Sequence, residues 1–196
     1  MAYTLLTSER SPFGRICRMF LHANAIPFNL DVANFVDDQV AAARVAKANP
    51  INKVPVLVDG SQSIFDSRVI INHLSHKHNI QALTLDEENM VSAAYSIMDT
   101  SVIFFLLKHD GIDINQPGNF FKRNHERIGR TLNFLVPWAL RQDPRKNWNY
   151  ATMSLYACLD WADRRAKTVV LADHPQLSEF VRKFSEAPGA NETKFY

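Results

Sequence analysis

The arrangement of strand and helix signals changes once along the chain, and this change limits the folds open to it. Over the first ~78 of the 196 residues, short apolar runs typical of strands alternate with segments of helical periodicity. From about Glu87 the strand pattern is absent and only helical patterns follow. We therefore predict a mixed α/β domain at 1–78 and an all-α domain at 86–196, with NIQALTLDEE as the linker.

The first domain has the predicted order β-α-β-α-β-β-α. Its strands are expected at 1–7, 26–32, 54–58 and 62–65, and its helices at 12–24, 37–48 and 67–78. A helix between the first two strands implies a right-handed parallel crossover. The Asp59-Gly60 turn makes the last two strands an antiparallel hairpin.

The second domain is predicted to hold helices over 87–109, 121–139, 149–167 and 176–185. The stretch VIFFLL at 102–107 is apolar all round, which indicates burial on several sides. Pro137 is expected to kink its helix or to end it early. Asn149 is a good helix cap, but Thr152 offers no carboxylate to complete a capping box.

Composition excludes several classes of protein. A hydrophobic content of 46% with 21% charged residues is that of a globular protein and argues against disorder. The net charge of +2 is spread along the chain, so we expect no nucleic-acid partner. No run reaches the ~18 consecutive apolar residues of a membrane span, so we expect no membrane. The start of the chain lacks signal-peptide features and the two cysteines form no CxxC pair, which favours a cytoplasmic protein.

Two segments combine residues that suggest a binding site. In KVPVLVDGSQSIFDS at 53–67, Pro55 opens a strand, and Asp66 and Ser67 stand at the start of a helix. Ser11-Pro12 stands at the start of the first helix. Each serine or aspartate has a purely local explanation, because these residue types are preferred helix caps. Together the segments suggest a binding site for a peptide-like ligand.

Four stretches carry a resemblance to a known family: SPFGRICRMFL, NPINKVPVLVDG, IFDSRVIINHL and LDWADRR. With these, the chain resembles the cytosolic glutathione transferases, specifically bacterial-type members with serine at the thiol-activating position. The resemblance implies a thioredoxin-like domain followed by an all-helical domain. It also implies an enzyme that uses reduced glutathione as co-substrate, needs no metal, attacks a small electrophile and forms a homodimer.

The resemblance assigns a role to each residue of the 53–67 segment. Pro55 matches the family's cis-proline, and the backbone of Val54 would pair with the cysteinyl part of glutathione. Asp66 would take the ammonium of the γ-glutamyl group and Ser67 its carboxylate, aided by the helix start. Lys53 would reach the glycine carboxylate, although it has an equally good reading as a solvated lysine.

At the first helix, the resemblance assigns Ser11 to the sulfur of glutathione. A serine cannot form a mixed disulfide, so its hydroxyl would instead donate a hydrogen bond to the thiolate. Ser8 is the nearest competitor for this role. A hydrolase nucleophile is a poor alternative, because no GxSxG elbow is present. Phe13, Ile103 and Leu107 are candidates for the wall of the second-substrate site.

Two other functions stay open at this point. The chain could be a non-catalytic binding or assembly module with this fold, or a glutathione-dependent peroxidase or disulfide reductase. His73, His76 and His78 lie close together but lack a completing acid or cysteine, so we expect them to be structural. Cys17 is expected to be a buried, inert thiol, and Arg15 a surface or interface residue.

Overall fold

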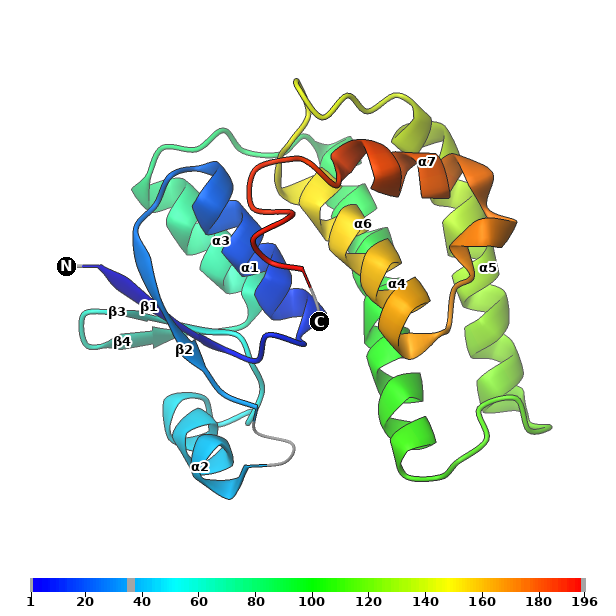
Figure 1. Ribbon diagram of the computed structural model, residues 1–196, viewed down its shortest axis with the longest axis horizontal. Coiled ribbons are helices and arrows are strands. Elements are labelled where there is room, and N and C mark those ends of the chain that lie inside the picture. The colour runs from blue at the N-terminus through cyan, green and yellow to red at the C-terminus, as the bar shows by residue number, and fades with distance from the viewer. Residues whose placement is uncertain (1, 35–37, 195–196) are drawn as a thin grey trace. The chain divides into compact units, whose positions relative to one another are not determined.

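The computed structural model describes residues 2–34 and 38–194. Its contacts divide the chain into two compact units: Met1–Ala82 together with Glu186–Tyr196, and Leu83–Ser185. The first unit contains a sheet with helices on both faces, and the second is built of helices (Figure 1). The expected fold class, a mixed α/β part followed by an all-α part, is confirmed.

The first unit has the predicted order of elements. These are β1 (Tyr3–Thr7), α1 (Pro12–Ala23), β2 (Phe28–Val32), α2 (Gln39–Ala48), β3 (Val56–Asp59), β4 (Gln62–Ile64) and α3 (Ser67–Lys77). The strand order is β2-β1-β3-β4, with β1 parallel to β2 and the other neighbours antiparallel. Asp38 caps α2, whereas Asp37, the first residue of the predicted helix, lies outside the described residues.

Alternation along the strands separates the two faces of the sheet. Leu6 and Val56 pack with Ala41 and Val45 of α2 in one buried cluster. Their neighbours Leu5 and Leu57, which are fully buried, point to the opposite face because successive strand residues alternate. That face is covered by α1 and α3 (Figure 1). The period-two pattern of the sequence thus accounts for the layers.

The second unit is organised around one buried helix. Its helices are α4 (Leu85–His109), α5 (Asn119–Leu140), α6 (Tyr150–Trp161) and α7 (Pro175–Phe184), with a π-helical turn at Ala162–Ala166 and a 3-10 turn at Leu171–Asp173. Every residue of α6 is buried. The helix α5 runs through Pro137 and ends at Leu140, so the expected early end at the proline is wrong.

The start of α6 also differs from its prediction. Asn149 caps the helix, and the hydroxyl of Thr152 accepts a hydrogen bond from the Asn149 N–H at 3.0 Å. A threonine hydroxyl therefore completes the capping box that we expected to stay open. The Asn149 side chain also donates to Glu87 Oε1 at 2.6 Å, while Glu87 Oε2 accepts from Thr84 at the start of α4.

The long helix α4 is less completely covered than its composition suggested. Phe104 is fully buried, but Ile103 and Leu106 are 48% and 45% exposed. An 18-residue window of α4 has a mean hydropathy of 1.7 and is half buried. By length and composition, α4 could cross a membrane, although we expected no segment of this kind. Core helices of soluble proteins also meet this criterion.

The C-terminal segment departs from the expected division of the chain. We placed residues 86–196 together in the helical domain, whereas Glu186–Tyr196 groups with the first unit. Its contacts with α1 explain this difference. Ala190 and Thr193 are fully buried, and their oxygens accept hydrogen bonds from Arg15.

Candidate functional site

Ser11 forms the cap of α1. It has an extended backbone, Pro12 follows it as the first helical residue, and its Oγ accepts a hydrogen bond from the Gly14 N–H at 3.1 Å. Ser11 thus has the helix-capping role that the sequence offered as an alternative to ligand binding. This role uses only a lone pair of the hydroxyl oxygen. Among residues 2–34 and 38–194, no acceptor for the Ser11 hydroxyl proton is found. The cap therefore leaves that proton available to a ligand.

The start of α1 is pressed closely against the end of β1. A Cβ atom on Gly14 would lie 1.9 Å from Thr7 Oγ1 and 3.0 Å from Thr7 Cβ. Thr7 itself is fully buried. Only glycine at position 14 permits this approach, which fixes how near Ser11 lies to the end of the sheet.

Ser8 differs from Ser11 in what its hydroxyl does. Its Oγ donates to Asn34 Oδ1 at 3.0 Å and accepts from the Arg10 N–H at 3.2 Å. Both functions of the Ser8 hydroxyl are therefore engaged within the protein. This geometry favours Ser11 over Ser8 as the donor to a ligand.

The Val54–Pro55 peptide bond is cis. The β1–β3 ladder ends with the pair Leu6 and Val56, so Val54 lies beyond it. In the described part of the chain, neither the N–H nor the C=O of Val54 has a hydrogen-bonding partner. Such a backbone can accept an added extended peptide. Lys53 beside it is exposed.

Asp66 and Ser67 begin α3, but with unequal accessibility. Asp66 is exposed and caps the helix, its Oδ1 accepting from the Arg68 N–H at 3.0 Å. Ser67 is only 2% exposed. The cap thus occupies one carboxylate oxygen of Asp66, and the near-burial of Ser67 leaves its backbone and hydroxyl little open surface.

The sheet register brings these segments to one end of the sheet. Continuing the β1–β3 pairing past Leu6 and Val56 places Val54 opposite Ser8, at the loop that leads to Ser11. Continuing the β3–β4 pairing past Leu57 and Ile64 places Asp66 opposite Pro55. Three segments that are far apart in the sequence therefore meet at this end.

The three candidates for the second-substrate wall are divided between the two units. Phe13 is half-buried in α1 of the first unit. In α4 of the second unit, Ile103 is exposed and Leu107 is half-buried. All three have some accessible surface within their own unit.

Of the three histidines near the end of α3, His73 and His78 make side-chain contacts, whereas His76 is exposed. His73 Nε2 lies 2.9 Å from Asp59 Oδ2, and Lys77 Nζ donates to the same oxygen at 2.5 Å. His78 Nε2 lies 2.9 Å from the Tyr3 hydroxyl. Because Tyr3 begins β1 and Asp59 ends β3, these contacts lie at the end of the sheet opposite to Ser11.

The two cysteines are fully buried. Burial, with a smaller effect of the Asp66 charge, raises the pKa of the Cys17 thiol far above its ordinary value. Burial likewise raises the pKa of Cys158, with a smaller effect of the Asp99 charge. Neither thiol is a nucleophile at neutral pH, in agreement with the expectation for Cys17.

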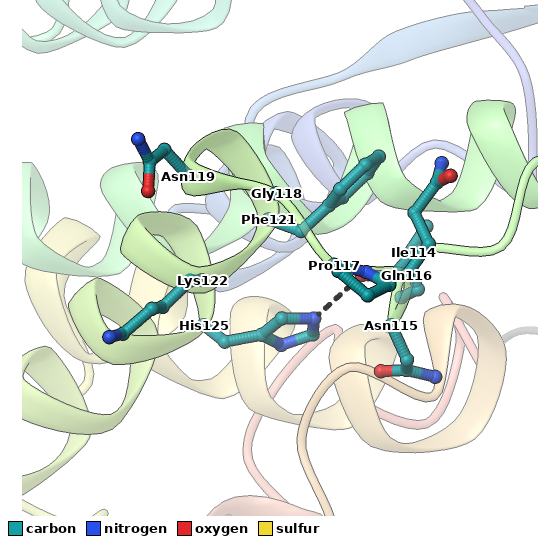
Figure 2. A pocket seen from close by; sticks show the side chains of 9 residues that line it. All are labelled: Ile114, Asn115, Gln116, Pro117, Gly118, Asn119, Phe121, Lys122 and His125. Carbon is teal, nitrogen blue, oxygen red and sulfur yellow. Dashed lines mark hydrogen bonds between the residues drawn. The ribbon is translucent and has the colours of Figure 1, made fainter.

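A pocket of about 400 Å³ lies in the second unit, between the α4–α5 loop and the first turns of α5 (Figure 2). His125 projects into it and lies 3.1 Å from the carbonyl oxygen of Ile114. The ring of His125 also packs on Phe104, with centroids 5.0 Å apart. None of the predicted site residues lines this pocket.

The prediction for Arg15 is wrong. Its side chain is fully buried, and that of Arg18, one turn further along α1, is 8% exposed. Ser11, Arg15 and Arg18 have the spacing i, i+4, i+7, which puts them on one face of the helix. The sequence therefore showed that the three residues share a face. It did not show that this face is buried, because the segment that covers it comes from the other end of the chain.

Part of the chain is similar to a known protein family. Residues 5–87 match the family described as glutathione S-transferase, N-terminal domain. This match covers less than half of the 196 residues, so it is a similarity of that part of the chain. The matched part contains every predicted glutathione-contacting residue, from Ser11 to Ser67.

Curated relatives extend the similarity in part. The chain is 33% identical over 138 residues to glutathione S-transferase theta-2 of Mus musculus, which covers 65% of this chain and 57% of that protein. It is 32% identical over 66 residues to glutathione S-transferase theta-1 of Homo sapiens, covering 34% and 28% of the two chains. The matched part thus spans about a quarter to just over half of these relatives.

Solved structures extend the fold similarity to the whole chain. A glutathione S-transferase from Methylobacillus flagellatus, with glutathione bound, has a TM-score of 0.84 at 18% identity and covers 100% of both chains. A glutathione transferase family member from Pseudomonas fluorescens Pf-5, also with bound glutathione, has a TM-score of 0.83 at 24% identity and covers 98% of both. The chain therefore has the glutathione transferase fold throughout, including the expected thioredoxin-like first domain.

Proposed function

We propose that this chain is a glutathione transferase of the serine type, which binds reduced glutathione and conjugates it to a small electrophile. One observation carries the proposal: Ser11 caps α1 through its oxygen and keeps its proton, at the end of the sheet where the backbone of Val54 is unpaired. A peptide thiol that pairs with Val54 as an added strand would have its sulfur near Ser11. The glutathione-bound relatives of the same fold support this ligand.

The energies are sufficient for thiolate stabilisation by a neutral hydroxyl. A free thiol has a pKa near ~8.5, so only a few per cent is ionised at neutral pH. A hydrogen bond to a charged group contributes roughly 1.5–3 kcal/mol, and a helix N-terminus about 0.3–1 kcal/mol. About 2 kcal/mol acting on the thiolate alone lowers the pKa by roughly 1.5 units to about 7, so about half of the bound thiol is ionised at neutral pH. No general base is needed.

The γ-glutamyl end of glutathione would bind at the start of α3. Asp66 uses Oδ1 for its cap, so Oδ2 would accept from the ammonium group. The carboxylate would bind at the positive end of the helix, at the small part of Ser67 that is accessible. The exposed Lys53 would reach the glycine carboxylate.

The remaining parts of the proposal concern the setting of the enzyme. Phe13, Ile103 and Leu107 would form part of the wall for the electrophile. Leu106, the half-exposed residue of the VIFFLL stretch outside that wall, would be covered in a homodimer. The protein would act in the cytoplasm, where its two buried thiols stay reduced.

The function is tested by calorimetry with reduced glutathione, followed by parallel assays with haloaromatic, hydroperoxide and disulfide substrates. We expect a complex and turnover of the haloaromatic compound. Turnover of only the hydroperoxide or the disulfide would assign the peroxidase or reductase function instead. A complex without turnover of any of the three would assign a binding module, and no complex at millimolar glutathione would contradict the proposal.

A further inference from the structure

Two arginines of α1 have an unusual environment for charged side chains. Arg15 is fully buried and Arg18 is 8% exposed, whereas arginine is almost never fully buried without partners. Desolvation lowers the pKa of Arg18, and the nearby charge of Arg15 adds to this, against an opposing effect of Glu9. Both side chains lie on the face of α1 that begins with Ser11. Something must compensate for their burial.

The C-terminal segment supplies hydrogen-bond acceptors to both arginines. Arg15 donates through Nη2 to the Ala190 carbonyl and through Nε to Thr193 Oγ1, both at 3.3 Å. Arg18 Nη2 donates to the Glu192 carbonyl at 3.1 Å. Residues 189–194, which we call the C-terminal strap, therefore lie along the arginine face of α1.

The strap has a defined conformation of its own. Thr193 Oγ1 donates to the Gly189 carbonyl at 2.6 Å, and the Lys194 N–H donates to the Asn191 carbonyl at 3.2 Å. Because the hydroxyl of Thr193 also accepts from Arg15, one chain of hydrogen bonds runs from α1 through Thr193 into the strap. The strap thus meets α1 as an ordered turn.

Gly189 sets how closely the strap approaches the helix. It has φ of +82°, and a Cβ atom there would lie 2.9 Å from His22 Cβ and 3.0 Å from Met19 Cα. The second of these is a backbone atom, which cannot move without moving the helix. The strap therefore contacts the main chain of α1 in the last turns of the helix, and it accepts hydrogen bonds from Arg15 and Arg18 in the middle of the helix.

We propose that the C-terminal strap fixes the position of α1 and thereby holds Ser11 in place for the thiolate, with Arg15 and Arg18 as positioning residues. The inference rests on the proposed role of Ser11. Ser11 caps the start of α1, so a shift of the helix moves its hydroxyl directly. Hydrogen bonds to a developing or full charge depend on sub-ångström placement, so a small shift lowers their strength.

The sharpest test is Gly189→Ala, because it acts on the strap without altering any residue of α1 or of the site. Gly111→Ala is the matched control: Gly111 has φ of +80°, and its Cβ would meet nothing within 4 Å. Both variants impose similar backbone strain, but only one forces the strap away from α1. Arg15→Met is a second variant, which breaks the same contact from the helix side.

Two readouts are needed: the pKa of the bound glutathione thiol, from the ultraviolet absorbance of its thiolate, and hydrogen exchange of the first-turn amides of α1. We expect Gly189→Ala and Arg15→Met to raise the thiol pKa by about one unit, the loss of part of one charge-assisted hydrogen bond. Exchange at the start of α1 should rise as well. Glutathione affinity at about pH 5, where the thiol is protonated, should be unchanged. Gly111→Ala should match the wild type.

The outcomes separate this inference from the proposed function. Faster exchange confined to the strap, with wild-type exchange in α1 and a wild-type thiol pKa, would overturn the inference. Equal effects of Gly189→Ala and Gly111→Ala would also overturn it. If the wild type shows no thiolate band, the proposed function fails. In that case, unchanged hydrogen exchange of α1 in Gly189→Ala would reject the role of the strap as well. Faster exchange of α1 in this variant would still support the hold of the strap on the helix.

Discussion

Ser11 has two hydrogen-bonding tasks in this account. Its oxygen accepts from the Gly14 N–H and its proton is reserved for the sulfur of glutathione. Capping and thiolate stabilisation are therefore compatible, whereas they stood as alternatives when only the sequence was considered. The distinction between Ser11 and Ser8 depends on Asn34, whose contact with Ser8 no local pattern could reveal.

Ser11→Ala should lower turnover with a haloaromatic substrate by roughly 10- to 100-fold, the loss of one hydrogen bond to a charged group. It should also reduce the free energy of unfolding by about 1 kcal/mol, because the cap is lost. Steady-state kinetics and urea unfolding measure the two effects. Ser11→Thr, which keeps the hydroxyl, should retain most of both, and Ser8→Ala should retain turnover. Full turnover in Ser11→Ala would transfer the role to Ser8.

Gly14→Ala should destabilise the protein, because the added methyl carbon would lie 1.9 Å from Thr7 Oγ1. Overpacking of this kind costs about 1–3 kcal/mol, measured as a lower urea midpoint at unchanged slope. Adding Thr7→Ala removes the nearest atom but leaves Cβ at 3.0 Å. The double variant should therefore recover part of the loss. Additive losses in the two single variants would mean that the contact is not the cause.

Among the helices and strands, the order of elements was predictable because each has strong local signals. The strands alternate, Ser11 and Asp66 cap α1 and α3, and Gly60 with φ of +62° forms the hairpin turn. Two predictions about the helices of the second unit were wrong. α5 continues past Pro137, and Thr152 replaces a carboxylate in the capping box of α6.

The capping box of α6 can be tested by Thr152→Val, which keeps the shape of the side chain and removes its hydroxyl. Thr152 is fully buried, and its hydroxyl accepts a hydrogen bond from the Asn149 N–H at 3.0 Å. The valine variant would leave this N–H without its acceptor. An unsatisfied buried group costs about 1–3 kcal/mol, which urea unfolding would detect. Thr152→Ser is the control that keeps the hydroxyl. Equal stability of the valine and serine variants would show that the box contributes nothing.

The end of α3 is joined to β3 by a contact that should depend on pH. Hydrogen bonds from Lys77 and then from His73 lower the pKa of Asp59 below its ordinary value. A carboxyl whose pKa is lowered in the folded state stabilises that state above the unfolded pKa of about 3.9, and this contribution is lost as the pH falls further. The unfolding free energy of the wild type should therefore drop more steeply below about pH 4 than that of Asp59→Asn. Parallel pH profiles of the two proteins would contradict this role.

At the scale of the whole molecule, the sequence predicted two parts but not the path of the last residues. The apolar pattern of α7 ends at Phe184, and nothing in the segment from Glu186 indicates where it binds. Its acceptors are backbone carbonyls and a threonine, which leave no periodic signal. The burial of Arg15 and Arg18 follows only when this segment is in place. Long-range backbone contacts of this kind cannot be inferred from residue types.

The proposed homodimer gives a prediction for α4. Leu106 is 45% exposed in the VIFFLL stretch, so Leu106→Glu would place a charge in the proposed subunit interface. We expect sedimentation velocity to show a dimer for the wild type and a monomer for this variant. Leu85→Glu, at a position that is 79% exposed at the start of the same helix, should remain dimeric. A wild type that sediments as a monomer would refute the dimer, and a dimeric Leu106→Glu would refute this interface.

The central claim is that a neutral hydroxyl at the start of α1 keeps the sulfur of bound glutathione ionised. It is tested most directly by titrating the thiolate absorbance of the glutathione complex against pH, in the wild type and in Ser11→Ala. We expect an apparent pKa near ~7 in the wild type, about 1.5 units below that of the free thiol, and a return toward ~8.5 in Ser11→Ala. A bound thiol in the wild type that titrates like free glutathione would contradict it.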